Sequence, residues 1–89
     1  MRIVNFNKIG KEGKDFEIAI KDIIGRVWGV PKAMIILSPY KTEWDTNRIT
    51  FGYWIPNRNR PVALQDKEGR LIVLNKEEYE EYYEELIKI

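Results

Sequence analysis

The hydrophobic pattern divides the chain into segments with two different periods. From Asp15 to Trp28 apolar residues recur every three or four positions, the spacing of one buried helix face. The stripe consists of Phe16, Ile20, Ile23 and Val27, widened by Ala19, Ile24 and Trp28. Gly29 can adopt the left-handed conformation that ends a helix, and Pro31 prevents continuation. Gly25, inside the helix, costs about 1 kcal/mol relative to alanine unless another group packs closely against it.

Strand-like segments fill most of the remaining chain. Residues 2–7 alternate weakly, with Val4 and Phe6 on one face, and predict a first strand. Residues 33–37 form a continuous apolar run between two prolines, which favours a central strand covered on both faces. Residues 48–55 alternate and predict the next strand.

A hairpin is predicted further along the chain. The strand-like segments 61–65 and 70–74 flank the tetrapeptide Asp-Lys-Glu-Gly at 66–69. Aspartate in the first position and glycine in the fourth are typical of a type I turn. We therefore expect these two segments to pair as antiparallel neighbours.

The last element is an amphipathic helix. Asn75 can cap its start, and Glu78 three residues later completes a capping box. The buried stripe is expected to consist of Tyr79, Tyr82, Tyr83 and Leu86. Tyrosine in such a stripe suggests a face that lies near the rim of a sheet, with the hydroxyls reaching water.

These elements follow one another in the order β-α-β-β-β-β-α. That order predicts the α+β class, in which an antiparallel sheet carries two packed helices. The length of 89 residues corresponds to a single domain, residues 1–89.

Composition narrows the possible chemistry. The chain contains no cysteine and no histidine, which excludes thiolate chemistry, a Ser-His triad and most zinc or copper sites. We therefore expect a protein that is not an enzyme and that binds no cofactor or metal. No apolar stretch is long enough to span a bilayer and the first residues do not form a signal peptide, so a cytoplasmic location is expected. Abundant isoleucine, glutamate and lysine suggest a thermophilic source.

Charge is distributed unevenly along the chain. Residues 1–63 hold 11 Lys or Arg against 6 Asp or Glu, a net charge of +5. Residues 64–89 hold 4 against 8, a net charge of −4. A basic body with an acidic final helix can steer partners, although the two parts can also neutralise each other by packing together.

The segment 46–61 is the main candidate for function, because it interleaves aromatic residues with arginines and asparagines. As a strand, its middle places Ile49, Phe51, Tyr53 and Ile55 on one face and Arg48, Thr50, Gly52 and Trp54 on the other. Arginine, a small residue and tryptophan on an outward face would offer cationic and stacking surface together. Proteins use this combination to hold nucleic acid or another protein.

Nucleic acid, DNA or RNA, is the first-choice ligand. In this hypothesis Arg48, Arg58 and Arg60 hold the phosphate backbone, while Trp54 and Trp44 stack on bases. The alternative is a protein-interaction module, such as a regulator, an inhibitor or a homodimer, that buries the same aromatic residues or uses the acidic final helix. A third interpretation has Trp54 covered by a helix or by the first strand, with Arg58 and Arg60 acting only as solubilising charges.

Overall fold

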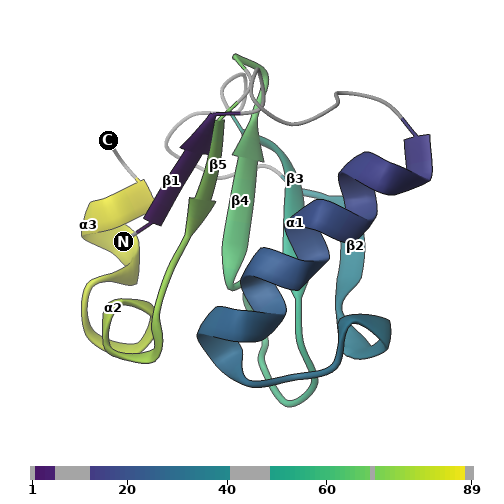
Figure 1. Cartoon of the computed structure of the whole chain (residues 1–89). Helices are drawn as coiled ribbons and strands as arrows, with labels where there is room; N and C mark the ends of the chain where they lie inside the picture. The colour runs from purple at the N-terminus through teal and green to yellow at the C-terminus, as the bar shows by residue number, and fades with distance from the viewer. Residues whose placement is uncertain (1, 6–12, 41–48, 69, 88–89) are drawn as a thin grey trace.

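A five-stranded antiparallel sheet with helices packed on it forms the framework of the protein (Figure 1). The computed structural model describes residues 2–5, 13–40, 49–68 and 70–87. Its elements are β1 (Arg2–Asn5), α1 (Gly13–Trp28), the short 3-10 helix η2 (Lys32–Met34), β2 (Ile36–Pro39), β3 (Ile49–Trp54), β4 (Ala63–Asp66), β5 (Arg70–Val73), α2 (Lys76–Glu81) and α3 (Tyr83–Ile87). The predicted α+β class is confirmed.

The strands lie in the order β1-β5-β4-β3-β2, and every neighbouring pair is antiparallel. Strands β2 to β5 follow one another as a meander, and β1 joins the sheet beside β5. Helix α1 crosses one face of the sheet, as Figure 1 shows. This order makes β1 and β2 the two edge strands among the described residues.

The position of β2 corrects the prediction of a central strand at 33–37. The first residues of that apolar run form η2, and β2 begins only at Ile36. Within the described chain β2 pairs with β3 alone, so Ile36 remains 63% exposed and Leu37 36% exposed. An apolar run is therefore not evidence of burial on both faces when it lies at the edge of a sheet.

Helix α1 packs on the sheet through a narrower stripe than the sequence predicts. Ile20 and Ile24 are fully buried, whereas Val27, expected in the stripe, is exposed. The indole N–H of Trp28 donates a 2.7 Å hydrogen bond to the carbonyl of Leu74. The C-terminal end of α1 is thereby attached to the chain that leaves β5.

The end of α1 follows the predicted rules for helix termination. Gly29 has φ +66°, and its N–H donates to the Gly25 carbonyl at 2.7 Å. A Cβ added at Gly25 would lie 2.7 Å from the Val30 carbonyl oxygen. Close approach of the returning chain thus explains a glycine inside the helix.

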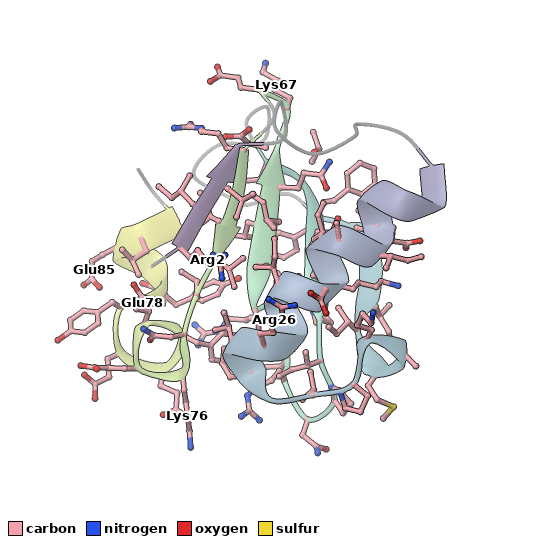
Figure 2. The ribbon with its side chains drawn as sticks, viewed as in Figure 1. Arg2, Arg26, Lys67, Lys76, Glu78 and Glu85 are labelled. Atoms are coloured by element: carbon pink, nitrogen blue, oxygen red, sulfur yellow. The ribbon has the colours of Figure 1, made fainter. Side chains whose placement is uncertain are left out.

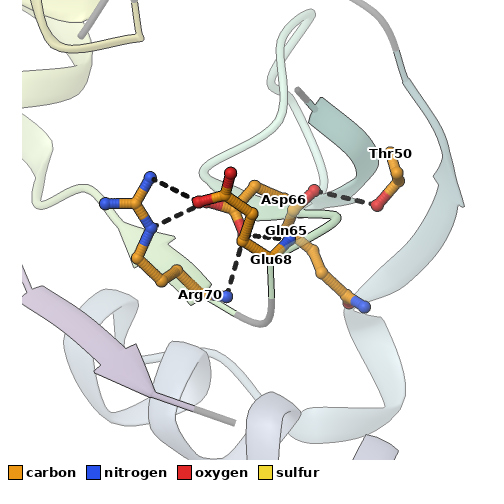
Figure 3. Close-up of polar contacts among 5 residues, drawn as sticks. All are labelled: Thr50, Gln65, Asp66, Glu68 and Arg70. Carbon is orange, nitrogen blue, oxygen red and sulfur yellow. Dashed lines mark hydrogen bonds and ion pairs between the residues drawn. The ribbon is translucent and has the colours of Figure 1, made fainter. Parts of the chain in front are cut away.

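The β4–β5 hairpin is confirmed, and a buried aspartate organises its turn (Figure 3). Asp66 accepts from the backbone N–H groups of Glu68 and Arg70 at 3.0 and 2.9 Å. Its second oxygen accepts from Nε of Arg70 at 2.9 Å. The Asp66 side chain is completely buried, and Arg70 together with two backbone N–H groups satisfies its carboxylate.

The final helix is capped as predicted but is divided in two. Asn75 and Glu78 form the reciprocal capping box, with both hydrogen bonds at 2.9 Å. Helix α2 ends at Glu81 and α3 begins at Tyr83. Tyr82 is exposed and therefore leaves the predicted stripe, whereas Tyr79 and Tyr83 are buried.

The core is continuous between the sheet and the helices, and Tyr53 is the largest of its fully buried side chains. Burial, and then the nearby Glu17, raises the pKa of Tyr53 above its ordinary value. Its hydroxyl donates to the side-chain oxygen of Gln65 at 3.0 Å. No helix in the described ranges is long and apolar enough to cross a membrane.

Candidate functional site

Strand β3 carries the predicted site, but its two faces differ from the expected division. Ile49 and Tyr53 are buried as predicted, whereas Phe51 is 36% exposed. Phe51 pairs with Pro39 of the edge strand β2, and the register of β3 against β4 shifts between Ile49 and Phe51. A cross-strand neighbour on the edge strand and a register irregularity therefore accompany the partial exposure of an aromatic ring of the predicted inner face.

The opposite face of β3 is partly covered, which corrects the expectation that Gly52 faces water. Gly52 is buried, and a Cβ added there would lie within 3 Å of Pro61 side-chain atoms and 3.0 Å from the indole of Trp54. Trp54 is half-buried, and its ring meets that of Tyr40 edge-on with centroids 5.5 Å apart. The indole thus lies along its own strand and keeps only part of its surface available for stacking.

The turn after β3 positions Arg58. Asn57 adopts a left-handed conformation with φ 66°, which asparagine tolerates better than most residues. Nη1 of Arg58 donates to the Asn57 carbonyl at 3.2 Å, and its guanidinium carbon lies 5.4 Å from the centroid of the Trp28 ring. Arg58 therefore rests against an aromatic ring at the end of α1.

Arg60 is held more firmly, by helices α2 and α3. Its guanidinium carbon lies 4.8 Å from the centroid of the Tyr79 ring and 4.2 Å from that of Tyr83. Nη2 donates to the Tyr79 carbonyl at 3.0 Å. The Tyr79 hydroxyl accepts from the Arg60 N–H and donates to the Arg60 carbonyl, both at 3.1 Å.

These contacts form an aromatic row that sequence reasoning missed. The rings of Trp28 and Tyr79 meet edge-on at 5.5 Å, and those of Tyr79 and Tyr83 at 5.4 Å. Burial, and then the neighbouring Tyr40, raises the pKa of Tyr83 well above its ordinary value. Even so, the buried Tyr83 hydroxyl has no well-formed hydrogen bond within the described chain. The prediction that the hydroxyls of this stripe reach water is thus wrong for Tyr83.

The tyrosine spacing of the last helix was the available signal for this row. Tyr79 and Tyr83 are four residues apart and therefore share a helix face. Arg60 contacts this face from a turn 19 residues before Tyr79. No local sequence pattern predicts that contact. Only long-range packing brings the turn and the two rings together.

Arg58 and Arg60 lack the carboxylate partner that four other described cations have, and among the described cations they are the ones that lie over aromatic rings. Lys21, Arg26, Lys32 and Arg70 each lie within 4.0 Å of an aspartate or glutamate oxygen. Among the residues that the structure describes, neither Arg58 nor Arg60 makes such an ion pair. An arginine stacked on a ring keeps N–H groups in its own plane, and these remain suited to an anion.

The acidic helices limit the direction from which an anion can approach. Helices α2 and α3 carry five exposed glutamates, namely Glu77, Glu80, Glu81, Glu84 and Glu85. Figure 2 labels Glu78 and Glu85 in this region of the molecule. Because like charges repel, an anionic ligand is expected to reach the arginines from the side of β3 and not over these helices.

Two of the predicted site residues, Trp44 and Arg48, lie outside the described residues. The structure therefore brings together Arg58, Arg60 and the aromatic row, and it places Trp54 beside Tyr40. Within the described ranges, no cluster of three or more acidic residues is arranged to hold a metal ion. The arrangement is suited to binding an anion by charge and hydrogen bonds.

Comparison with known proteins adds no candidate role. No family model, curated protein or solved structure matches this chain. The functional interpretation therefore depends on the geometry of the turn and of strand β3.

Proposed function

We propose that this protein is a non-enzymatic binding module for nucleic acid, with its site at β3 and the turn 57–60. The observation that carries the proposal is the pair of arginines without carboxylate partners, each seated on an aromatic ring. Arg58 and Arg60 would contact phosphates through their in-plane N–H groups. Ring stacking limits the motion of each guanidinium, so less conformational entropy is lost when a phosphate binds.

Trp54 would supply the stacking surface beside the arginines. Its half-buried ring is supported by Tyr40 and can still offer part of its surface to a base. Trp44 and Arg48 remain part of the proposal from the sequence alone. Stacking on an aromatic ring is tolerant of sequence, so we expect little preference among bases.

The test is fluorescence anisotropy with labelled single-stranded DNA and RNA oligonucleotides between about 50 and 200 mM salt. Affinity should fall steeply as salt rises. Arg58→Ala and Arg60→Ala should each reduce the slope of log K against log salt by about 0.7, the value for one phosphate contact on a single strand.

The matched control is Arg26→Ala. Arg26 is more exposed than either turn arginine, lies on α1 (Figure 2) and already pairs with Asp22 at 2.9 Å. The Arg26→Ala substitution removes the same charge from another surface, so the slope of log K against log salt should stay unchanged. Absence of binding to any oligonucleotide at low salt, or an equal effect of all three variants, would overturn the proposal.

A further inference from the structure

The outer side of β2 has a defined hydrogen-bonding pattern. The Tyr40 N–H donates to the Thr50 carbonyl at 3.1 Å, in register with the pairing of β2 and β3. In an antiparallel pair, hydrogen-bonded positions alternate with positions whose N–H and C=O groups point away. Ser38 and Ile36 therefore bond to β3, while the backbone groups of Leu37 and Pro39 point to the side where no described strand pairs.

This outer side is poor in donors. Proline has no N–H, so Pro39 offers only a carbonyl there. The Ile35 N–H is already used, because it donates to the Lys32 carbonyl at 3.1 Å. The edge consequently presents the N–H of Leu37 and the carbonyls of Leu37 and Pro39, and by the same alternation the carbonyl of Ile35.

A second copy of β2 fits this pattern badly. An antiparallel pair centred on Leu37 would form hydrogen bonds only between the two Leu37 residues. On either side, a carbonyl of one strand would meet a proline or an occupied N–H of the other. The exposed apolar side chains of this edge, Ile36, Leu37, Pro39 and Phe51, cover on the order of a few hundred Å², well short of the ~800 Å² per partner of a standard interface.

From this mismatch we infer that the β2 edge accepts an extended peptide segment of another protein as a sixth strand. A proline-free segment can donate to the carbonyls of Ile35 and Pro39 and exchange both hydrogen bonds with Leu37. Its residue opposite Leu37 is apolar and lies beside Leu37 and Phe51. The neighbouring residue opposite Ile36 lies on the other face and can be threonine, whose methyl group contacts Ile36. This surface adjoins the proposed nucleic-acid site, because Ile36 pairs with Trp54, but it uses the backbone edge of β2 and not the turn 57–60.

The edge residues also explain why β2 pairs with one added strand and does not lead to continued edge-to-edge association. Strand β2 contains no charged residue, so neither face repels a charged or neutral segment. Pro39 and η2 limit the pairing to a short stretch, which makes the contact weak and reversible. Short edge strands that contain proline are a known means of preventing uncontrolled association.

The inference is tested by NMR with the whole chain and an end-capped seven-residue probe of alternating valine and threonine. We expect binding with Kd of about 1 mM or tighter, with the largest shifts at the amides of β2 and slower hydrogen exchange of the Leu37 N–H. Probes N-methylated on one alternate set of residues should bind at least tenfold more weakly. Methylation of the other set, which faces away from β2, should have little effect.

Leu37→Pro provides the matched variant of the protein. Of the backbone hydrogen-bonding groups it removes only the outward N–H, and it leaves the bonds between β2 and β3, so the chain should stay folded and bind the probe at least tenfold more weakly. Leu37→Ala keeps the N–H and should bind better than Leu37→Pro. The inference fails if the probe causes no shifts in β2, or if both methylated probes bind equally. It also fails if the free chain forms a dimer through β2, or if its Leu37 amide is already protected.

Discussion

Two turns of the same sheet hold arginines in different ways. In the β4–β5 hairpin, Arg70 faces the buried carboxylate of Asp66 at 2.9 Å. In the turn after β3, Arg58 and Arg60 lie against aromatic rings and make no carboxylate contact within the described chain. The hairpin contains both acidic and basic residues and pairs them. The turn 57–60 contains arginines alone, which donate to the backbone carbonyls of Asn57 and Tyr79.

The difference separates structural charges from available ones. Asp66 needs Arg70, because an unpaired carboxylate in a dry site is costly. Rings of tyrosine and tryptophan can support a guanidinium without neutralising it. A cation that is positioned but not neutralised is the feature expected of an anion-binding site, and it distinguishes the turn 57–60 from the hairpin.

The largest expected effect is at the hairpin. Asp66→Ala should lower the free energy of unfolding by about 3 kcal/mol, because two backbone N–H groups and Arg70 lose their acceptor. Urea denaturation followed by circular dichroism measures it. Glu68→Ala serves as the control, since its 3.9 Å contact with Arg70 is exposed and should contribute under 0.5 kcal/mol. Equal losses in the two variants would mean that the buried carboxylate does not organise the turn.

The next effect separates two tyrosines of the aromatic row. Tyr79→Phe should cost about 1–2 kcal/mol, because the hydroxyl bonds to both the N–H and the carbonyl of Arg60. Tyr83→Phe should be neutral or slightly stabilising, because its buried hydroxyl lacks a well-formed partner within the described residues. Thermal unfolding of both variants compares them directly. A larger loss for Tyr83→Phe would show that its hydroxyl is bonded in solution.

A smaller difference is expected between the two arginines. Arg60→Ala should lower the free energy of unfolding by about 1 kcal/mol, since it contacts two rings and the Tyr79 carbonyl. Arg58→Ala should change it by less than 0.5 kcal/mol. Both variants should weaken binding of nucleic acid. If Arg58→Ala were the more destabilising variant, the conclusion that Arg60 is held more firmly than Arg58 would be wrong.

The smallest effect concerns alkaline pH. Burial raises the pKa of Tyr83 above its ordinary value of 10, so the folded chain holds this proton more tightly than the unfolded chain. The stability from this group is complete below pH 10 and is lost as pH rises, by about 0.4 kcal/mol at pH 10 itself. Denaturation at pH 8 and pH 10 should show a smaller decrease for Tyr83→Phe than for the unmodified chain. An identical decrease would place the Tyr83 hydroxyl in water.

Local sequence signals predicted local structure well. The capping box at Asn75, the helix end at Gly29 and the turn that begins at Asp66 all occur as expected. Each depends on groups that lie within a few residues of one another. Local reasoning marks Gly25 as a weak point of the helix unless a group packs closely against it, and the Val30 carbonyl is that group.

The predictions of burial were wrong where a neighbouring element decides whether a residue is covered. Residues 33–37 have the composition of a central strand, but the meander places β2 at the edge. Gly52 was expected in water, but Pro61 and Trp54 cover it. Strand alternation assigns residues to faces and does not reveal what lies over either face.

The amino-acid sequence by itself determined the α+β class, the caps and the hairpin, because periodicity and short-range hydrogen bonds act over a few residues. The tertiary structure alone decided which strands are edges, which rings receive Arg58 and Arg60, and that Asp66 rather than a turn arginine is buried. Those outcomes depend on contacts between residues far apart in the chain. Such contacts have no regular spacing in the sequence, so the sequence alone does not predict which residues meet.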